Sequence, residues 1–208
     1  AMRGWYYLAG YVLVWSLPYI YFDLTSPEDN GGYLIMNFVG IGLNFALLYT
    51  LLSSNEILDS GAKTGIPAYF GLSILHSIGL LVGFVFLVLP GFYLLIRWIA
   101  AFARLIDSDE GIVSAMRWSW QRTSEHWLKL ALAFVGPLAF YSIAIACLIY
   151  QEVFWELYPQ EPWETMYTWT TVVANLALSI GMAWYALLGV AAYACLRDAN
   201  ELIAETFE

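Results

Sequence analysis

Arg97 is the residue whose type and position most directly suggest chemistry. It lies in residues 92–106, a strongly apolar segment whose other charged side chain is Arg104. An ionisable side chain within a lipid bilayer is costly, so its presence there indicates a function by default. A guanidinium carries five N–H donors in a planar fork that matches the oxygens of phosphate or carboxylate. We therefore interpret Arg97 as a candidate ligand of an anion such as a lipid phosphate.

Three asparagines are expected at depths similar to that of Arg97. The rise of a helix places Arg97 roughly 10 Å below the turn at Pro90 and Gly91. The corresponding depths are roughly 6, 16 and 13 Å for Asn37, Asn44 and Asn175. These side chains predict a polar cluster in the outer half of a helical bundle. The alternative is structural: Arg97 extends outward and donates to carbonyls freed near Pro90, while the asparagines bond between helices.

Three more basic residues and one histidine complete the candidate set. The anionic headgroups of the inner leaflet attract basic residues. We expect contacts with this leaflet from Arg104, Arg117 and Arg122. His76 lies in an apolar segment near serines and is a candidate for a proton relay or for a hydrogen bond between helices. The plainer interpretations are a topological anchor for each arginine and a structural role for His76.

The composition of the chain identifies the environment of these residues. Of 208 residues, 61% are apolar, 18% aromatic and only 12% charged, and the mean hydropathy is +0.67. Soluble domains carry about 25% charged residues. These values indicate an integral membrane protein whose length suits about six spanning helices. The net charge is −9 and the sequence has no run of Lys or Arg, which excludes nucleic acid as a partner.

Apolar segments of about 20 residues predict the transmembrane helices, because the hydrocarbon core of a bilayer is about 30 Å thick. Polar connections separate six such segments, which together form one integral membrane domain over residues 1–208. Pro90 and Gly91 are expected to break the helix between the third and the fourth. The fold class is therefore all-α, with spans at residues 5–22, 33–52, 66–89, 92–106, 127–150 and 167–196.

Two local patterns refine this architecture. The segment Asp107-Ser108-Asp109-Glu110 is expected to cap a helix over residues 109–122. In this helix Ile112, Met116 and Trp120 recur at every fourth position. Such a helix suits the cytoplasmic membrane interface. Gly79 and Gly83 form a GxxxG pair in the third span, which permits close packing against another helix.

The distribution of charge predicts the orientation of the chain. Six alternating spans place most of the basic residues on one face, so the positive-inside rule puts both termini in the cytoplasm. These basic residues are Arg3, Lys63, Arg104, Arg117, Arg122, Lys129 and Arg197. The opposite loops carry Asp23, Glu28, Asp29, Glu152, Glu156, Glu161 and Glu164. With these loops assigned, no span contains an Asp or Glu that could neutralise Arg97.

A longer pattern begins at Leu89-Pro90-Gly91 and continues to Trp127. After the Leu-Pro-Gly turn it contains Arg97, Asp107, Gly111, Ala115, the pair Ser119-Trp120, and Thr123. In this pattern the chain resembles the membrane-domain family associated with glycerophosphoryl diester phosphodiesterases, and related uncharacterised bacterial six-helix membrane proteins. The resemblance implies a multi-pass protein of the bacterial inner (plasma) membrane, and it does not imply an enzyme.

These observations lead us to expect a non-enzymatic function. The chain is interpreted as a lipid-binding or membrane-organising protein whose partners are membrane lipids, with another membrane protein or self-association as the alternative. A small-solute transporter and a lipid-modifying enzyme with unrecognised catalytic groups are the other hypotheses. We expect no cofactor and no metal, because neither the histidines nor the cysteines have the spacing of metal ligands.

Overall fold

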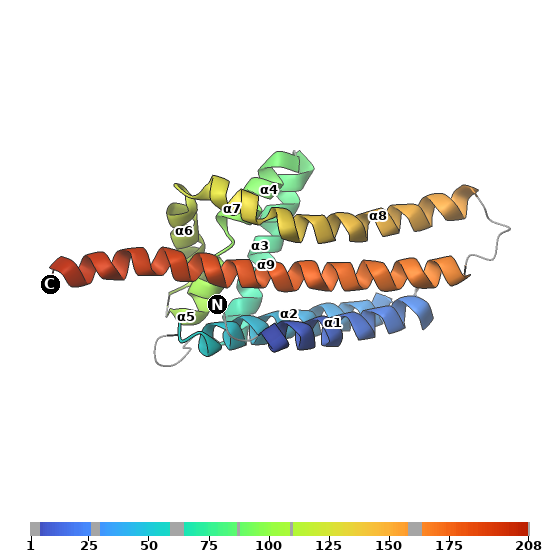
Figure 1. Cartoon of the computed structure of the whole chain (residues 1–208), viewed down its shortest axis with the longest axis horizontal. Helices are drawn as coiled ribbons and strands as arrows, with labels where there is room; N and C mark the ends of the chain where they lie inside the picture. The colour runs from blue at the N-terminus through green and yellow to red at the C-terminus, as the bar shows by residue number, and fades with distance from the viewer. Residues whose placement is uncertain are drawn as a thin grey trace. The chain divides into compact units, whose positions relative to one another are not determined.

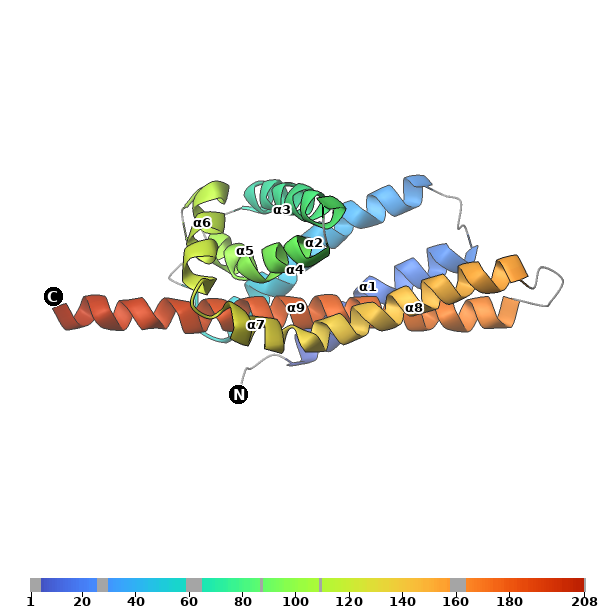
Figure 2. The same ribbon diagram turned by 90° about the horizontal axis from the view of Figure 1, so that it is seen from above.

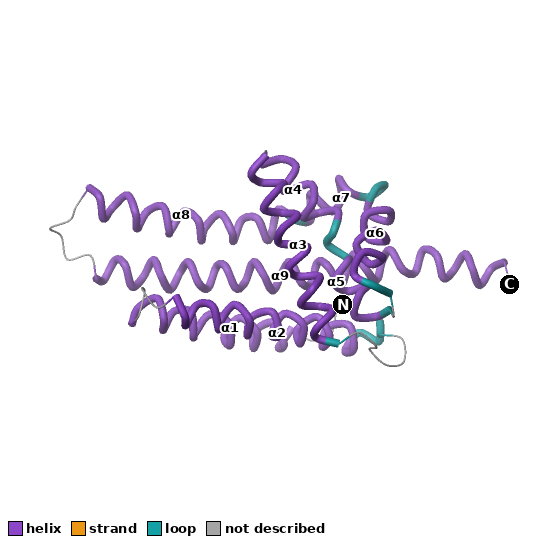
Figure 3. The backbone as a smooth tube through the Cα atoms, turned by 180° about the vertical axis from the view of Figure 1, so that it is seen from behind, coloured by secondary structure: helices purple, strands orange, loops and turns teal. Residues whose placement is uncertain are grey.

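The computed structural model describes residues 5–25, 30–58, 65–86, 88–108, 110–157 and 164–207. These ranges are helical with short connections and contain no strand, which confirms the predicted all-α class (Figure 3). In chain order the described helices are α1 (Trp5–Thr25), α2 (Asn30–Ser54), α3 (Ile66–Phe86), α4 (Val88–Arg97), α5 (Ala101–Asp107), α6 (Ile112–Thr123), α7 (Trp127–Ala133), α8 (Val135–Leu157) and α9 (Glu164–Phe207).

Five helical segments of the described chain are long and apolar enough to cross a membrane. They are Gly31–Ser54, Ile66–Val85, Leu89–Asp107, Val135–Phe154 and Glu164–Arg197. They correspond to the second to sixth predicted spans, and α1 is not among them, so the count of six is not confirmed. Seven of the 21 residues of α1 are Trp or Tyr, whose polar ring atoms lower its hydropathy.

Several residues on which the predicted orientation depends lie outside the described ranges. They are Arg3, Glu28, Asp29, Lys63 and Glu161. The placement of both termini in the cytoplasm therefore stays a prediction.

The described chain divides into two compact units. The first lies within Asn44–Phe134 and Tyr185–Glu208, and the second within Trp5–Leu43 and Val135–Trp184. The helices α2 and α9, which are labelled in Figure 1, contribute residues to both units. That the chain forms a single membrane domain stays a prediction.

The second unit contains α1, the first part of α2, α8 and the first part of α9. Small residues allow these helices to approach closely. A Cβ added to Gly181 of α9 would lie 3.2 Å from the Tyr141 ring of α8. A Cβ added to Gly40 of α2 would lie only 2.1 Å from the Trp15 ring of α1, so the ring occupies the space that the glycine leaves.

In the first unit, α3 and α4 pack against each other (Figure 2). A Cβ at Gly83 would lie 3.0 Å from the Cα atom of Gly91, which confirms that the GxxxG segment permits close packing. The predicted break at Pro90 and Gly91 is wrong, because both residues lie inside α4. Proline is tolerated in a first turn, where its missing N–H would have no helical partner.

The fourth predicted span is interrupted. The helix α4 ends at Arg97, residues 98–100 form a turn, and α5 begins at Ala101. Hydrophobic packing holds α5, the helix that follows the break. The buried cluster consists of Leu72, Ala101, Leu105, Ala115 and Met116. This cluster joins α3, α5 and α6 within the first unit.

The amphipathic segment after α5 forms α6, as predicted, although it begins later than expected. Its N-cap residue is Gly111, in an extended conformation and without a side-chain cap hydrogen bond. Two of the residues expected to cap the helix bond elsewhere, Asp107 to Tyr193 and Glu110 to Arg104. Asp109 lies outside the described residues, so its part in a cap stays a prediction. That α6 lies in the membrane interface stays a prediction. The fifth predicted span is divided into α7 and α8 by a turn at Phe134.

One face of α9 contacts the interrupted span at Leu95, Ile99 and Asp107. Residues 185, 189, 193 and 197 are four positions apart and therefore lie on the same side of a helix. The Tyr185 hydroxyl donates to the Leu95 carbonyl of α4 at 3.3 Å. Gly189 lies against the carbonyl of Ile99 in the turn, which a Cβ would approach to 2.7 Å. This face of α9 fixes the course of α4, the turn and α5.

Candidate functional site

Arg97 is the last residue of α4, and its side chain is buried. It is 3% exposed, and its Nε and Nη1 atoms have no hydrogen-bond partner among the described residues. The guanidinium carbon lies 4.5 Å from the centre of the Trp120 ring and 5.6 Å from that of Tyr93. The environment of the guanidinium is therefore aromatic, with no described carboxylate bonded to Nε or Nη1.

Aromatic rings stabilise such a cation only in part. A cation–π contact contributes about 0.5–2 kcal/mol, whereas a buried charge without a hydrogen-bonded counter-ion costs several kcal/mol. The structural alternative, in which Arg97 donates to carbonyls freed near Pro90, is not supported by the Nε and Nη1 atoms, because neither bonds to a described carbonyl. The arrangement suits a ligand that brings negatively charged oxygen atoms to these donors.

The main chain of Arg97 is held by two side chains of α6. The Ser119 hydroxyl donates to the Arg97 carbonyl at 2.8 Å, and the Thr123 hydroxyl lies 3.2 Å from the same oxygen. Both side chains are fully buried. Because the turn after α4 frees this carbonyl from the helical pattern, the two hydroxyls replace the missing backbone donor.

We expect Ser119→Ala to destabilise the protein by about 1 kcal/mol, the net value of one hydrogen bond, while Thr123 retains the carbonyl. The change should appear as a small decrease in the thermal unfolding midpoint in detergent. Ser114→Ala on the exposed side of the same helix is the matched control. Equal midpoints for the two variants would contradict a role for Ser119 in holding the break.

The structure does not place all the predicted polar cluster in one unit. Asn44 belongs to the first unit with Arg97, whereas Asn37 and Asn175 belong to the second. Asn37 accepts a hydrogen bond from the Tyr19 hydroxyl at 3.1 Å. Asn175 donates to an oxygen of Asp23 at 2.7 Å. These contacts fit the interhelical bonds of the structural alternative, and a role of the asparagines in anion binding stays a prediction.

Asp23 is a polar residue whose role the sequence analysis missed. It was assigned to an outer loop, but it lies in α1, where Tyr33 donates to its second carboxylate oxygen. The Tyr167 hydroxyl donates to its backbone carbonyl at 3.3 Å. The apolar run over residues 19–22 continues directly into Asp23, and no proline or glycine follows until Pro27. This is the signal that could have placed Asp23 in the helix.

His76 is buried in the first unit between two aromatic side chains. Its ring centre lies 5.8 Å from that of Trp98 and 5.2 Å from that of Phe102. The Nε2 atom has no hydrogen-bond partner in the described structure. These contacts fit a packing role, and the proton relay stays a prediction.

The three arginines predicted to face the inner leaflet differ in their surroundings. Arg104 forms an ion pair with Glu110, and its guanidinium lies 5.2 Å from the Trp118 ring centre. Arg117 is exposed and Arg122 is half-buried. The charge of Arg104 is thus balanced within the chain. Neither Arg117 nor Arg122 forms an ion pair with another residue in the described part of the chain. Their contact with lipid stays a prediction.

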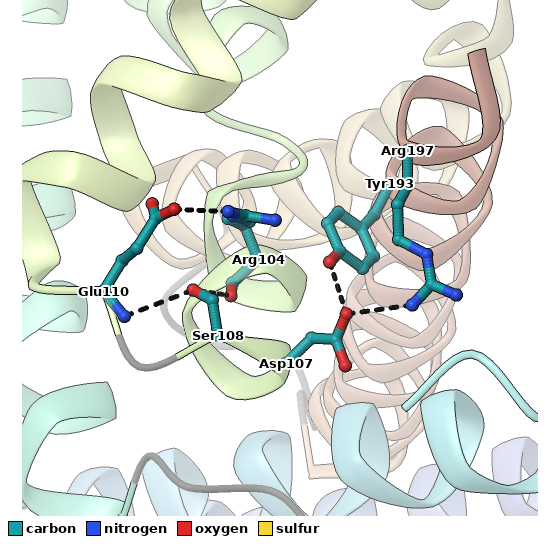
Figure 4. Close-up of polar contacts among 6 residues, drawn as sticks. All are labelled: Arg104, Asp107, Ser108, Glu110, Tyr193 and Arg197. Atoms are coloured by element: carbon teal, nitrogen blue, oxygen red, sulfur yellow. Dashed lines mark hydrogen bonds and ion pairs between the residues drawn. The ribbon is translucent and has the colours of Figure 1, made fainter. Parts of the chain in front are cut away.

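A second polar network joins α5 to α9 (Figure 4). One carboxylate oxygen of Asp107 accepts hydrogen bonds from the Tyr193 hydroxyl at 2.5 Å and from Arg197 Nη1 at 3.0 Å. Arg197 also donates to the carbonyl of Ile57, which follows α2. The Asp107 side chain is 3% exposed. The network holds three segments of the first unit together.

Sequence reasoning identified Asp107 only as a residue of a family pattern and of a helix cap. Its partners follow it by 86 and 90 residues, and no local pattern connects them. The described residues contain no group of three or more His, Cys, Asp or Glu that could hold a metal ion. Both cysteines are free.

One comparison with known proteins found a match, and it covers most of the residues described above. A family model described as the membrane domain of glycerophosphoryl diester phosphodiesterase matches residues 61–196. No curated protein and no solved structure matches the chain. The matched residues contain Arg97, Asp107, Ser119, Thr123 and Tyr193.

Proposed function

Because the chain belongs to the family of the membrane domain of glycerophosphoryl diester phosphodiesterase, we propose that it is a non-enzymatic lipid-binding protein whose Arg97 holds an anionic headgroup. Family membership and the apolar helices identify an integral membrane protein. We place it in the bacterial inner membrane with both termini in the cytoplasm, which the positive-inside rule supports.

The buried guanidinium of Arg97 carries this proposal. Two of its nitrogen atoms have no hydrogen-bond partner in the described structure, although the side chain is only 3% exposed. In water these donors would be hydrated, so their burial favours a bound acceptor. A phosphate or carboxylate offers paired oxygens to such a fork. In a membrane, anionic headgroups are the most abundant source of these groups.

The surface charges support the same function at longer range. Arg117 and Arg122 lie on α6, which packs beside α5 in the same unit as Arg97. Basic residues at a membrane surface attract anionic lipids by about 1 kcal/mol each. Arg104 adds less to this attraction, because Glu110 balances its charge.

The proposal is tested by native mass spectrometry of the protein purified gently from membranes. We expect the wild type to retain an anionic lipid and Arg97→Gln to lose it, with an affinity at least tenfold lower, because charge-assisted hydrogen bonds contribute about 1.5–3 kcal/mol. Arg117→Gln is the matched control: it removes an exposed guanidinium whose attraction acts only at longer range, so it should lose clearly less lipid than Arg97→Gln.

The opposite result would be an identical, unselective mixture of lipids on the wild type and Arg97→Gln. Arg97 would then be a structural residue, and the search for function would turn to protein partners. Circular dichroism and the thermal midpoint of Arg97→Gln, measured in parallel, separate the loss of a ligand from the loss of the fold.

A further inference from the structure

Three aromatic side chains from different helices form a contiguous exposed group in the first unit, which we call the aromatic surface. It consists of Tyr93 of α4, Trp120 of α6 and Trp127 of α7, which are 40%, 37% and 43% exposed. The Tyr93 ring centre lies 5.7 Å from that of Trp120 and 6.2 Å from that of Trp127, both in edge-on contacts. Tyr93 thus joins the other two rings into one surface.

The aromatic surface lies directly over the guanidinium of Arg97. The rings of Tyr93 and Trp120, which are exposed on the outside, are also the rings that contact the cation. The backbone carbonyl of Arg97 is held by the buried hydroxyls of α6 instead. The partly exposed aromatic surface is therefore a route by which a ligand could reach the cation.

The residues beside the aromatic surface suit a membrane interface. The candidate span that contains α8 begins at Val135, so α7 precedes it. On α7, Leu128 and Leu132 are 59% and 68% exposed, and Lys129 is exposed between them. Trp and Tyr favour the headgroup level of a bilayer, and lysine attracts anionic lipid there. Exposed leucines beside them offer contact to acyl chains.

We propose that Arg97 receives its anion laterally from the membrane, as the phosphate of an anionic phospholipid that docks on the aromatic surface. This inference rests on the proposed function and specifies the source of the ligand. The acyl chains of the lipid remain against Leu128 and Leu132, while the phosphate passes the Trp120 ring to reach Nε and Nη1. A free inorganic anion has no apolar part to gain from these contacts.

The geometry favours a lipid over a dissolved anion for a physical reason. A phosphate must lose its hydration to reach a guanidinium that is covered by rings, whether it is dissolved or part of a lipid. A lipid phosphate starts at the interface, and its chains stay in an apolar environment throughout. The tryptophan ring is wide and amphipathic, so it can contact both the chains and the headgroup.

Photo-crosslinking in nanodiscs tests the proposal on the full chain. A benzophenone amino acid replaces Trp127 in one variant and Leu128 in a second, and the discs contain phosphatidylglycerol and phosphatidylcholine in equal parts. The matched control carries the same group at Ile78 of α3, which is 54% exposed in the same unit. We expect phosphatidylglycerol to be enriched about fivefold at 127 and 128 over the control position.

The enrichment should disappear when Arg97→Gln is added to either labelled variant, and inorganic phosphate should not compete with it. Equal lipid composition at all three positions would overturn the lateral route. If Arg97→Gln still loses its lipid in native mass spectrometry, the proposed function survives that result. Competition by inorganic phosphate would indicate a dissolved anion instead, and adducts with protein would indicate that a partner covers the aromatic surface. Either of these results would also overturn the inference.

Discussion

Replacing Asp107 by alanine is expected to lower the free energy of unfolding by about 3–5 kcal/mol, the largest effect of any single change considered for this chain. The carboxylate accepts hydrogen bonds from both Tyr193 and Arg197, and its side chain is 3% exposed. Its removal takes an acceptor from a hydroxyl and a counter-ion from a guanidinium whose side chain is only 16% exposed. The Tyr193 hydroxyl and the Arg197 guanidinium then lie at the junction of α5 and α9 without this carboxylate.

Thermal unfolding in detergent, followed by tryptophan fluorescence, measures this loss. For a chain of this length the expected decrease in the midpoint is about 10 °C. Glu110→Gln is the matched control, because it breaks the other ion pair of the region, in which the glutamate side chain is 36% exposed. A partly exposed pair of this kind contributes about 0–1 kcal/mol, so the control midpoint should move by about 4 °C or less.

A double variant distinguishes the contribution of the Asp107–Arg197 ion pair from that of the other contacts of the two side chains. Adding Arg197→Met to Asp107→Ala removes the uncompensated cation, and it should recover part of the lost stability. If Asp107→Ala and Glu110→Gln shift the midpoint equally, or if the double variant is less stable by the full sum of the two single changes, then the network does not hold α5 to α9.

Gly189→Ala is expected to destabilise the protein by about 1–3 kcal/mol, the cost of overpacking. The added methyl group would lie 2.7 Å from the carbonyl oxygen of Ile99, a separation that side chains do not adopt. That oxygen belongs to the backbone of the turn between α4 and α5, so it cannot move aside as a flexible side chain would. The helix α9 must shift, or the turn must.

The matched control for this change is Gly42→Ala in α2, where nothing lies within 4 Å of the added atom. Alanine is the better helix former by about 1 kcal/mol, so the control should be neutral or stabilising. The two substitutions are chemically identical and should therefore have opposite signs in thermal unfolding. A stabilising effect at Gly189 would show that the turn and α9 are not in close contact.

Much of the fold could be predicted from hydropathy alone. The predicted spans at residues 33–52 and 66–89 overlap α2 and α3 over most of their length, because a continuous apolar run has few alternatives to a helix in a bilayer. The helix α6 was found from its periodicity. The prediction failed where no helix-breaking residue marks the end of a helix. The turn at residues 98–100 has the sequence Trp-Ile-Ala, without glycine or proline.

The candidate site, too, could be predicted from the sequence only in part. Arg97 was identifiable because a charge in the interior of an apolar run is conspicuous in the sequence. Tyr93 lies four positions before it on the same helix and therefore on the same side. Trp120 was not identifiable as a neighbour, since it reaches Arg97 only after the chain has turned between α4 and α6. The partners of Asp107 lie still further along the chain. Long-range contacts of this kind depend on packing geometry, which a local pattern does not encode.

The close contact between α3 and α4 has a consequence for how the protein enters the membrane. Arginine at the centre of a span opposes insertion by about 2.5–3.5 kcal/mol, whereas each leucine favours it by only about 0.3–0.6 kcal/mol. The segment Leu89–Asp107 contains both Arg97 and Arg104, while Ile66–Val85 contains no arginine or lysine. A Cβ at Gly83 would lie 3.0 Å from the Cα atom of Gly91, so the two helices can pack closely as the arms of a hairpin. We therefore expect the apolar α3 to favour insertion of the segment that carries the two arginines.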